Sequence, residues 1–136
     1  MDTRGERNNN PLNLEDIGIP WEGLANPPSD EAGYCRFVSS LMGLRAGARD
    51  LYESWRLDGL QTIEKLVYHF APPSENDTEA YIVDVATRTG IARDTVLELG
   101  EPPTLANLVT AFVWHENGKC SYDPALILQA CTMALG

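Results

Sequence analysis

The apolar residues that precede Glu116 recur with the spacing of an α-helix, and this pattern limits the possible folds more than any other feature. They lie four, seven, eight and eleven positions before Glu116, so they share one face of a helix with it. These residues are Phe112, Val109, Leu108 and Leu105. Gly118 is typical of the residue that ends a helix. The pattern predicts a core helix whose last turn carries a carboxyl group at the edge of the buried face.

A carboxyl group in that position suits acid catalysis. Partial burial and the negative end of the helix dipole both disfavour an ionised carboxylate. A carboxylic acid that keeps its proton near neutral pH is what a glycosidase uses to protonate the oxygen of a leaving sugar. The alternative is a glutamate that extends into water at a fraying helix end. The local pattern leaves both interpretations of Glu116 open.

The remaining periodicity predicts a mainly α fold in one domain that spans residues 1–136. Residues 1–36 are expected to form an irregular or short-stranded N-terminal segment, and residues 37–136 to be helical. Isolated apolar residues from Leu12 to Trp21 either form short strand-like pieces or lay a loop on the core. Helices are predicted from Ser39 or Ser40, over 62–71, from an Asn76 capping box to about 89, from Pro102 to Glu116, and from Asp123-Pro124, with a single turn at 94–99.

Composition excludes several classes of function. A net charge of −10 argues against a nucleic-acid partner, and no apolar run is long enough to span a bilayer. The stretch 1–7 lacks the apolar core of a secretory signal, so synthesis in the cytoplasm is expected. Three cysteines and two histidines with these spacings predict free thiols, no metal site and no cofactor.

Two polar segments are candidates for substrate binding. The amide-rich stretch 8–13 either forms a turn that satisfies its own backbone or presents Asn10 and Asn13 to a sugar. The stretch 71–82 either caps a helix or forms a cleft rim with several polar side chains. Those side chains are Glu75, Asn76, Asp77, Thr78 and Tyr81.

Two further groups of side chains have a structural interpretation, and the first also has a functional one. Trp21 is either a core residue or a platform on which a sugar stacks. Arg45 and Arg49, with Asp50 and Glu53 nearby, are predicted to form a solvated ion-pair face.

Taken together, the motifs resemble those of a family of small phage virion or prophage structural proteins, some with lysozyme-like, peptidoglycan-degrading character. The resemblance extends over nearly the whole chain, and the combination of motifs is specific although each motif is short. It rests on Arg4–Pro11, Trp21–Gly23, Phe37–Ser39, Gly43–Ala46, Ala71–Thr78, Tyr81-Ile82 and His115–Gly118.

A second resemblance implies a mechanism. The motif order is similar to that of flagellar-type glucosaminidases and lytic transglycosylases, with the glutamate helix moved from the front of the chain to the back. This implies a lysozyme-like single domain in circularly permuted order. Permutation is physically reasonable because the two ends of a domain usually lie close together at its surface.

The two resemblances imply a peptidoglycan-cleaving glycosidase of lysozyme, glucosaminidase or lytic transglycosylase type. Glu116 would be the general acid, Tyr81 would orient it, and Asn10 and Asn13 would hold the glycan. In hydrolysis, Asp77 or Glu75 would be the second carboxylate. The protein would act in the phage virion or after delivery to the bacterial periplasm. The alternative is an inactive lysozyme-like phage protein that binds a phage or host protein.

Overall fold

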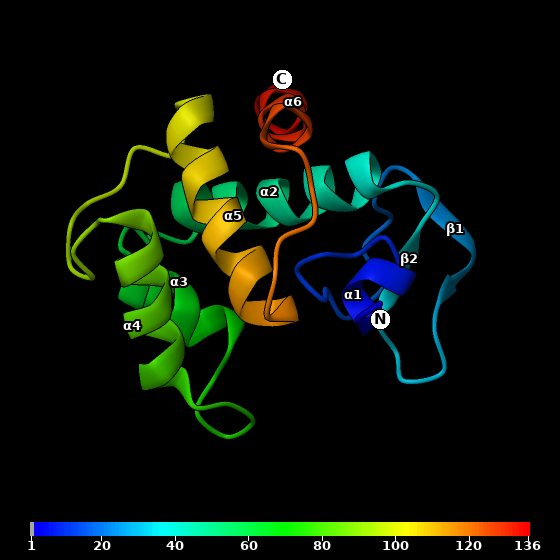
Figure 1. The fold of residues 1–136 in the computed structure, drawn as a ribbon, viewed down its shortest axis with the longest axis horizontal. Helices are drawn as coiled ribbons and strands as arrows, with labels where there is room; N and C mark the ends of the chain where they lie inside the picture. Colours follow the sequence, from blue (N-terminus) through cyan, green and yellow to red (C-terminus); the bar gives the residue numbers. More distant parts are fainter. Residues whose placement is uncertain (1) are drawn as a thin grey trace.

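A long helix, α2 (Ser40–Leu57), crosses the middle of the molecule, and the other elements pack around it (Figure 1). The computed structural model describes residues 2–136, so the first residue of the stretch 1–7 lies outside the described residues. The other elements are α1 (Arg4–Arg7), β1 (Leu24–Ser29), β2 (Cys35–Phe37), α3 (Ile63–Phe70), α4 (Thr78–Thr89), α5 (Pro102–Asn117) and α6 (Pro124–Leu135). The mainly α fold is confirmed.

The helices and the N-terminal segment occupy opposite sides of the molecule. In Figure 1, α3 and α4 lie on the left, and α1 with the two strands lies on the right. Helix α5 crosses α2 between them, so that its C-terminal end reaches the region where the two sides meet. Buried side chains from both sides belong to one hydrophobic core.

Helix α5 follows the predicted apolar pattern. Its four stripe residues have no exposed surface. Pro102 stands at the first position of the helix, where a missing N–H costs nothing. Gly118 ends the helix with φ +70°, a left-handed conformation that glycine adopts without strain. The sequence therefore predicted both the helix and the residue that ends it.

Side-chain caps fix the starts of most of the other helices. Ser39 caps α2 and Asp123 caps α6, as expected, and Thr62 caps α3 instead of lying within it. The predicted Asn76 cap is wrong. The Asp77 carboxylate accepts from the backbone N–H of Ala80 at 3.1 Å, whereas the Asn76 amide donates to the carbonyl of Pro72. Both residue types are good caps, so α4 begins one residue later than the pattern indicated.

The N-terminal segment is more regular than the sequence predicted. Helix α1 has a capping box between Thr3 and Glu6. Strands β1 and β2 pair antiparallel, with Leu24 opposite Phe37, and β2 crosses the expected boundary at residue 36. Neither strand lies in the Leu12 to Trp21 stretch. Leu12 is instead fully buried and anchors this stretch in the core.

Residues 94–99 do not form the expected helical turn. The N–H of Leu97 donates to the carbonyl of Gln61 at 2.9 Å, and the indole of Trp55 donates to the carbonyl of Leu97 at 3.0 Å. The N–H and the carbonyl of Leu97 are therefore satisfied by residues distant in sequence, whereas the N–H of Thr95 donates to the nearby carbonyl of Ala92 at 3.1 Å. Among residues 2–136, every helix is too short or too polar to cross a membrane.

Two glycines let the N-terminal segment approach α2 closely. A Cβ atom on Gly43 would lie 1.6 Å from the carbonyl oxygen of Asn9, and one on Gly47 would lie 3.0 Å from the Leu12 side chain. Any larger residue at position 43 would collide with backbone. The first contact therefore fixes where the N-terminal segment sits on the helix.

We predict that Gly43→Ala lowers the free energy of unfolding by about 1–3 kcal/mol, because the added methyl group must displace the Asn9 backbone. Urea denaturation followed by circular dichroism measures the change. Gly100→Ala is the matched control, since a Cβ there meets no atom within 4 Å, and it should shift stability by less than about 0.5 kcal/mol. Equal effects of the two substitutions would contradict this account of Gly43.

Candidate active site

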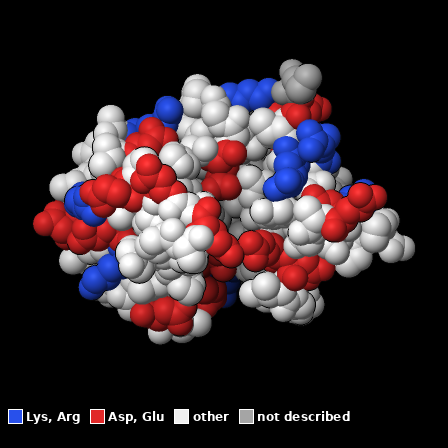
Figure 2. All heavy atoms as spheres, turned by 90° about the horizontal axis from the view of Figure 1, so that it is seen from below, with Lys and Arg blue, Asp and Glu red and all other residues white. Residues whose placement is uncertain are grey.

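A pocket of about 540 Å³ opens between the N-terminal segment and the helices. One wall comes from residues 4–34 and the other from α2, the end of α3, the loop that follows it and the last turn of α5. The lining includes the carboxyl groups of Glu15, Asp50, Glu75 and Glu116. Seen from below, acidic side chains gather along the furrow between the two sides of the molecule (Figure 2). We refer to this pocket as the cleft.

Two neutral donors hold the Glu116 carboxyl group in the cleft. The Asn13 amide donates to Oε1 at 2.9 Å, and the Tyr81 hydroxyl donates to Oε2 at 2.8 Å. Asn13 belongs to the N-terminal segment and Tyr81 to α4, so the carboxyl group is bound from both sides. The hydrogen bond expected between Tyr81 and Glu116 is present. Glu116 itself is half-buried, and this arrangement fixes the direction in which it faces.

The Tyr81 side chain is fixed by its surroundings. It is buried, with its ring centroid 3.8 Å from that of His115 and 5.4 Å from that of Phe112. Burial, followed by the negative charge of Glu116, raises the pKa of Tyr81 well above its usual value. The hydroxyl therefore keeps its proton at neutral pH and remains a donor to Glu116.

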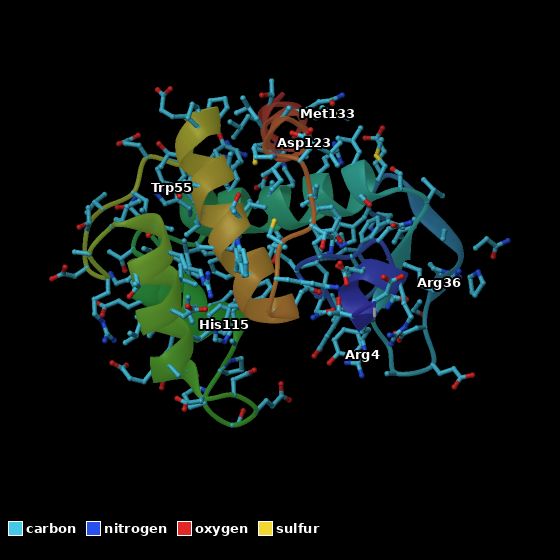
Figure 3. The ribbon with its side chains drawn as sticks, viewed as in Figure 1. Arg4, Arg36, Trp55, His115, Asp123 and Met133 are labelled. Atoms are coloured by element: carbon cyan, nitrogen blue, oxygen red, sulfur yellow. The ribbon has the colours of Figure 1, made fainter. Side chains whose placement is uncertain are left out.

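His115 extends the contact network to the outer side of α4. Its Nδ1 lies 2.8 Å from Oδ2 of Asp84, one turn along α4 from Tyr81. Figure 3 shows His115 at the end of α5 that faces α4, and Arg4 on the opposite side of the molecule. The pairing of His115 with Asp84 holds the imidazole against the Tyr81 ring.

The loop that carries Asn13 is tied to the end of α5. The Asn117 amide donates to the carbonyl of Pro11 at 2.8 Å and accepts from the Thr3 hydroxyl at 2.6 Å. Asn13 has φ +51°, a left-handed conformation that asparagine tolerates better than most residues. The residue next to Glu116 in sequence therefore positions the loop that binds Glu116.

Asn10, which was predicted to bind substrate, does not line the cleft. Asn10 has no exposed surface, and its amide donates to the carbonyls of Leu14 and Cys35 at 3.0 Å each. Its oxygen accepts from the N–H of Leu14. These bonds pin the turn to β2, so the turn interpretation of this asparagine is correct.

The polar residues of 75–78 divide between two pockets. Glu75 and Asn76 line the cleft with Glu116. Asp77 and Thr78 instead line a groove of about 920 Å³ beside α3 and α4, which Asn76 also borders. Thr78 is buried and donates to the carbonyl of Ala71, and Asp77 caps α4. The structure therefore does not bring Asp77, the predicted second carboxylate, or Thr78, a predicted substrate ligand, into the cleft with Glu116.

Asp50 is a cleft residue that the sequence interpretation missed. It was expected in a solvated ion-pair face, and Arg49 does pair with Glu53 on that face. Arg45 pairs with Glu22 at 3.2 Å, and Asp50 lines the cleft. The spacing of Asp50 from Gly43 and Gly47 was the available signal, because all three lie on one face of α2.

Aromatic side chains on the N-terminal wall complete the cleft. Trp21 packs partly against the core and also lines the cleft, and its role as a platform for a sugar stays a prediction. The Arg4 guanidinium lies 4.4 Å from the centre of the Tyr34 ring, and both residues border the cleft. Among residues 2–136, no group of three or more His, Cys, Asp or Glu side chains is placed to hold a metal ion.

The fold and the site define a small, mainly helical protein with an acidic cleft around one glutamate. No protein-family model matches the chain. The chain is 40% identical over 122 residues to Protein P5 of Pseudoalteromonas phage PM2, and the match covers 88% of this chain and 74% of Protein P5. The chain therefore belongs to the family of Protein P5 of phage PM2.

We predict that the two asparagines three positions apart differ in their effect on stability. Asn10→Ala removes the side-chain partner of three backbone groups, of which the Leu14 carbonyl still accepts from the N–H of Cys35, and it should lower the free energy of unfolding by about 1–3 kcal/mol. Asn13→Gly suits the left-handed backbone and removes one half-exposed hydrogen bond, so its cost should stay below about 1 kcal/mol. The denaturation midpoints of the two variants measure both losses of stability. A larger loss for Asn13→Gly would reverse the assignment.

Proposed function

We propose that this protein cleaves the glycan strand of peptidoglycan, with Glu116 as the proton donor. The observation that carries the proposal is the position of Glu116 in the cleft, with each carboxyl oxygen bound by a neutral side chain. Positioned acids of this kind contribute about 10²–10⁴-fold to the rate of a proton-transfer step.

In the proposed reaction, Glu116 gives its proton to the glycosidic oxygen as the bond from that oxygen to the anomeric carbon breaks. Two routes then complete the reaction. In transglycosylation, a hydroxyl of the same sugar closes an anhydro ring and returns its proton to Glu116. In hydrolysis, water attacks with the help of a second carboxylate. Asn13, Glu75 and Asn76 are placed to bind sugar hydroxyls, and Trp21 offers a stacking surface.

The lysozyme-like fold in permuted order is part of this proposal. It is supported by the arrangement of two sides around a cleft, with the glutamate at the end of a core helix. Membership in a family with a phage protein supports a role in the virion, or after delivery to the periplasm, since a phage must pass the bacterial cell wall.

A second candidate function is a non-enzymatic phage protein that binds another protein. The observation that favours it is the second groove, which Tyr68, Pro72 and Pro73 line beside α3 and α4. Tyr68 is 59% exposed there, more than a large aromatic side chain usually is. The net charge of −10 would suit a basic partner.

We predict that the purified protein releases soluble fragments from peptidoglycan and that Glu116→Gln reduces the rate by about 10²–10⁴-fold. Glutamine keeps the shape of the side chain and an acceptor for Tyr81, so the thermal midpoint should change little. Zymograms followed by mass analysis of the products measure the reaction. Glu101→Gln is the control, because Glu101 is an exposed glutamate at the opposite end of α5.

Two results would reject the enzymatic proposal. One is a folded Glu116→Gln variant that cleaves as fast as the unaltered protein. The other is the absence of any product from the unaltered protein, together with no shift of the Asn13 or Tyr81 resonances in added chitooligosaccharide. The second result would favour the protein-binding alternative.

A further inference from the structure

Asp50 is a half-buried carboxylate in the same cleft as Glu116. Within residues 2–136, its side chain accepts no hydrogen bond and forms no ion pair. The next acidic residue on α2, Glu53, instead pairs with both Arg49 and Arg56. An acidic group withdrawn from water without a partner costs folding free energy, so its position calls for a reason other than stability.

The position of Asp50 follows from the packing of α2. Gly43, Gly47 and Asp50 are spaced by four and three residues and therefore lie on one face of the helix. Gly43 and Gly47 leave room for the N-terminal segment. Asp50 lies on the same face of α2 and lines the cleft. The packed helix fixes Asp50 more firmly than loops fix the exposed cleft residues Glu15 and Glu75.

We propose that Asp50, which lines the same cleft as Glu116, is the catalytic base and that the protein is a hydrolase rather than a transglycosylase. This inference rests on the proposed cleavage of a glycan strand. Glu116 protonates the glycosidic oxygen as its bond to the anomeric carbon breaks. Asp50 takes a proton from water as the water oxygen forms the new bond to that carbon. Asp50 then returns its proton to solvent, Glu116 takes one up, and the glycan gains a new reducing end.

The unpartnered state of Asp50 suits this role. Its oxygens are free to accept a proton from water, because no donor from the described residues 2–136 occupies them. Burial is the main influence on its titration and raises the pKa of the Asp50 carboxyl from its usual value, while His69 acts in the opposite direction. A carboxylate with a raised pKa is a stronger proton acceptor. Glu75, the remaining candidate from the sequence, is exposed on a loop.

The test compares Asp50→Asn with the unaltered protein on purified peptidoglycan. The rate should fall by about 10²-fold or more. The midpoint temperature of thermal unfolding should stay the same or rise, since the substitution removes an unpartnered charge. Asp94→Asn, the same charge change at an exposed residue outside the cleft, should retain full activity. Each cleavage by the unaltered protein should add one molecule of water. The products should therefore have reducing ends and no anhydro ends.

A second variant separates chemistry from folding. Asp50→Ala leaves space beside the anomeric carbon, and sodium formate added to it should restore cleavage by supplying a small carboxylate. Formate should not restore Glu116→Gln, because that variant lacks the acid. A residue that only supports the fold would not be rescued in this way.

The outcomes distinguish the two proposals. If the unaltered protein releases no glycan fragments, the proposed function fails and the role of Asp50 fails with it. If it releases fragments with anhydro ends, or if Asp50→Asn keeps the rate, the proposed function stands and the role of Asp50 is overturned. A loss of activity explained by a lower thermal midpoint, without rescue by formate, also overturns it.

Discussion

The contact between the Asn9 backbone and α2 determines the form of the rest of the molecule. A single Cβ at position 43 would occupy the place of the Asn9 carbonyl oxygen, so glycine at that position allows the N-terminal segment to lie directly on the helix. Leu12 is then buried against Gly47, and Asn13 comes within hydrogen-bond distance of Glu116. One wall of the cleft therefore exists because two residues of α2 have no side chain.

The helices could be predicted because their signals are local. Helix α5 combines an apolar repeat, prolines at its start and a glycine at its end, and each signal acts within a few residues. The cap of α4 was placed one residue early because Asn76 and Asp77 are both good caps. Residues 94–99 were wrongly expected to be helical because their hydrogen-bond partners, such as Gln61, are distant in sequence.

The site was only partly predictable from the sequence, because its contacts join residues that are distant in the chain. Tyr81 and Glu116 were paired through a resemblance to known glycosidases, and no local pattern showed that they would meet. Asn10 and Asn13 belong to one turn, yet one is sealed under β2 and the other faces the cleft. Tertiary packing sets the orientation of each amide, and the local sequence around the two asparagines does not reveal it. Asp50 was missed because its burial requires the N-terminal segment to lie on α2.

The last turn of α5 connects these parts. Glu116 accepts bonds from Asn13 and Tyr81, and its neighbour Asn117 binds the carbonyl of Pro11. A Cβ on Gly5 would lie 2.6 Å from Oδ1 of Asn117, so α1 also packs against this turn. Because the same turn carries the carboxyl group and anchors the wall that orients it, any change that loosens the N-terminal segment also frees one oxygen of Glu116. The geometry of the carboxyl group thus depends directly on the docking of residues 2–13.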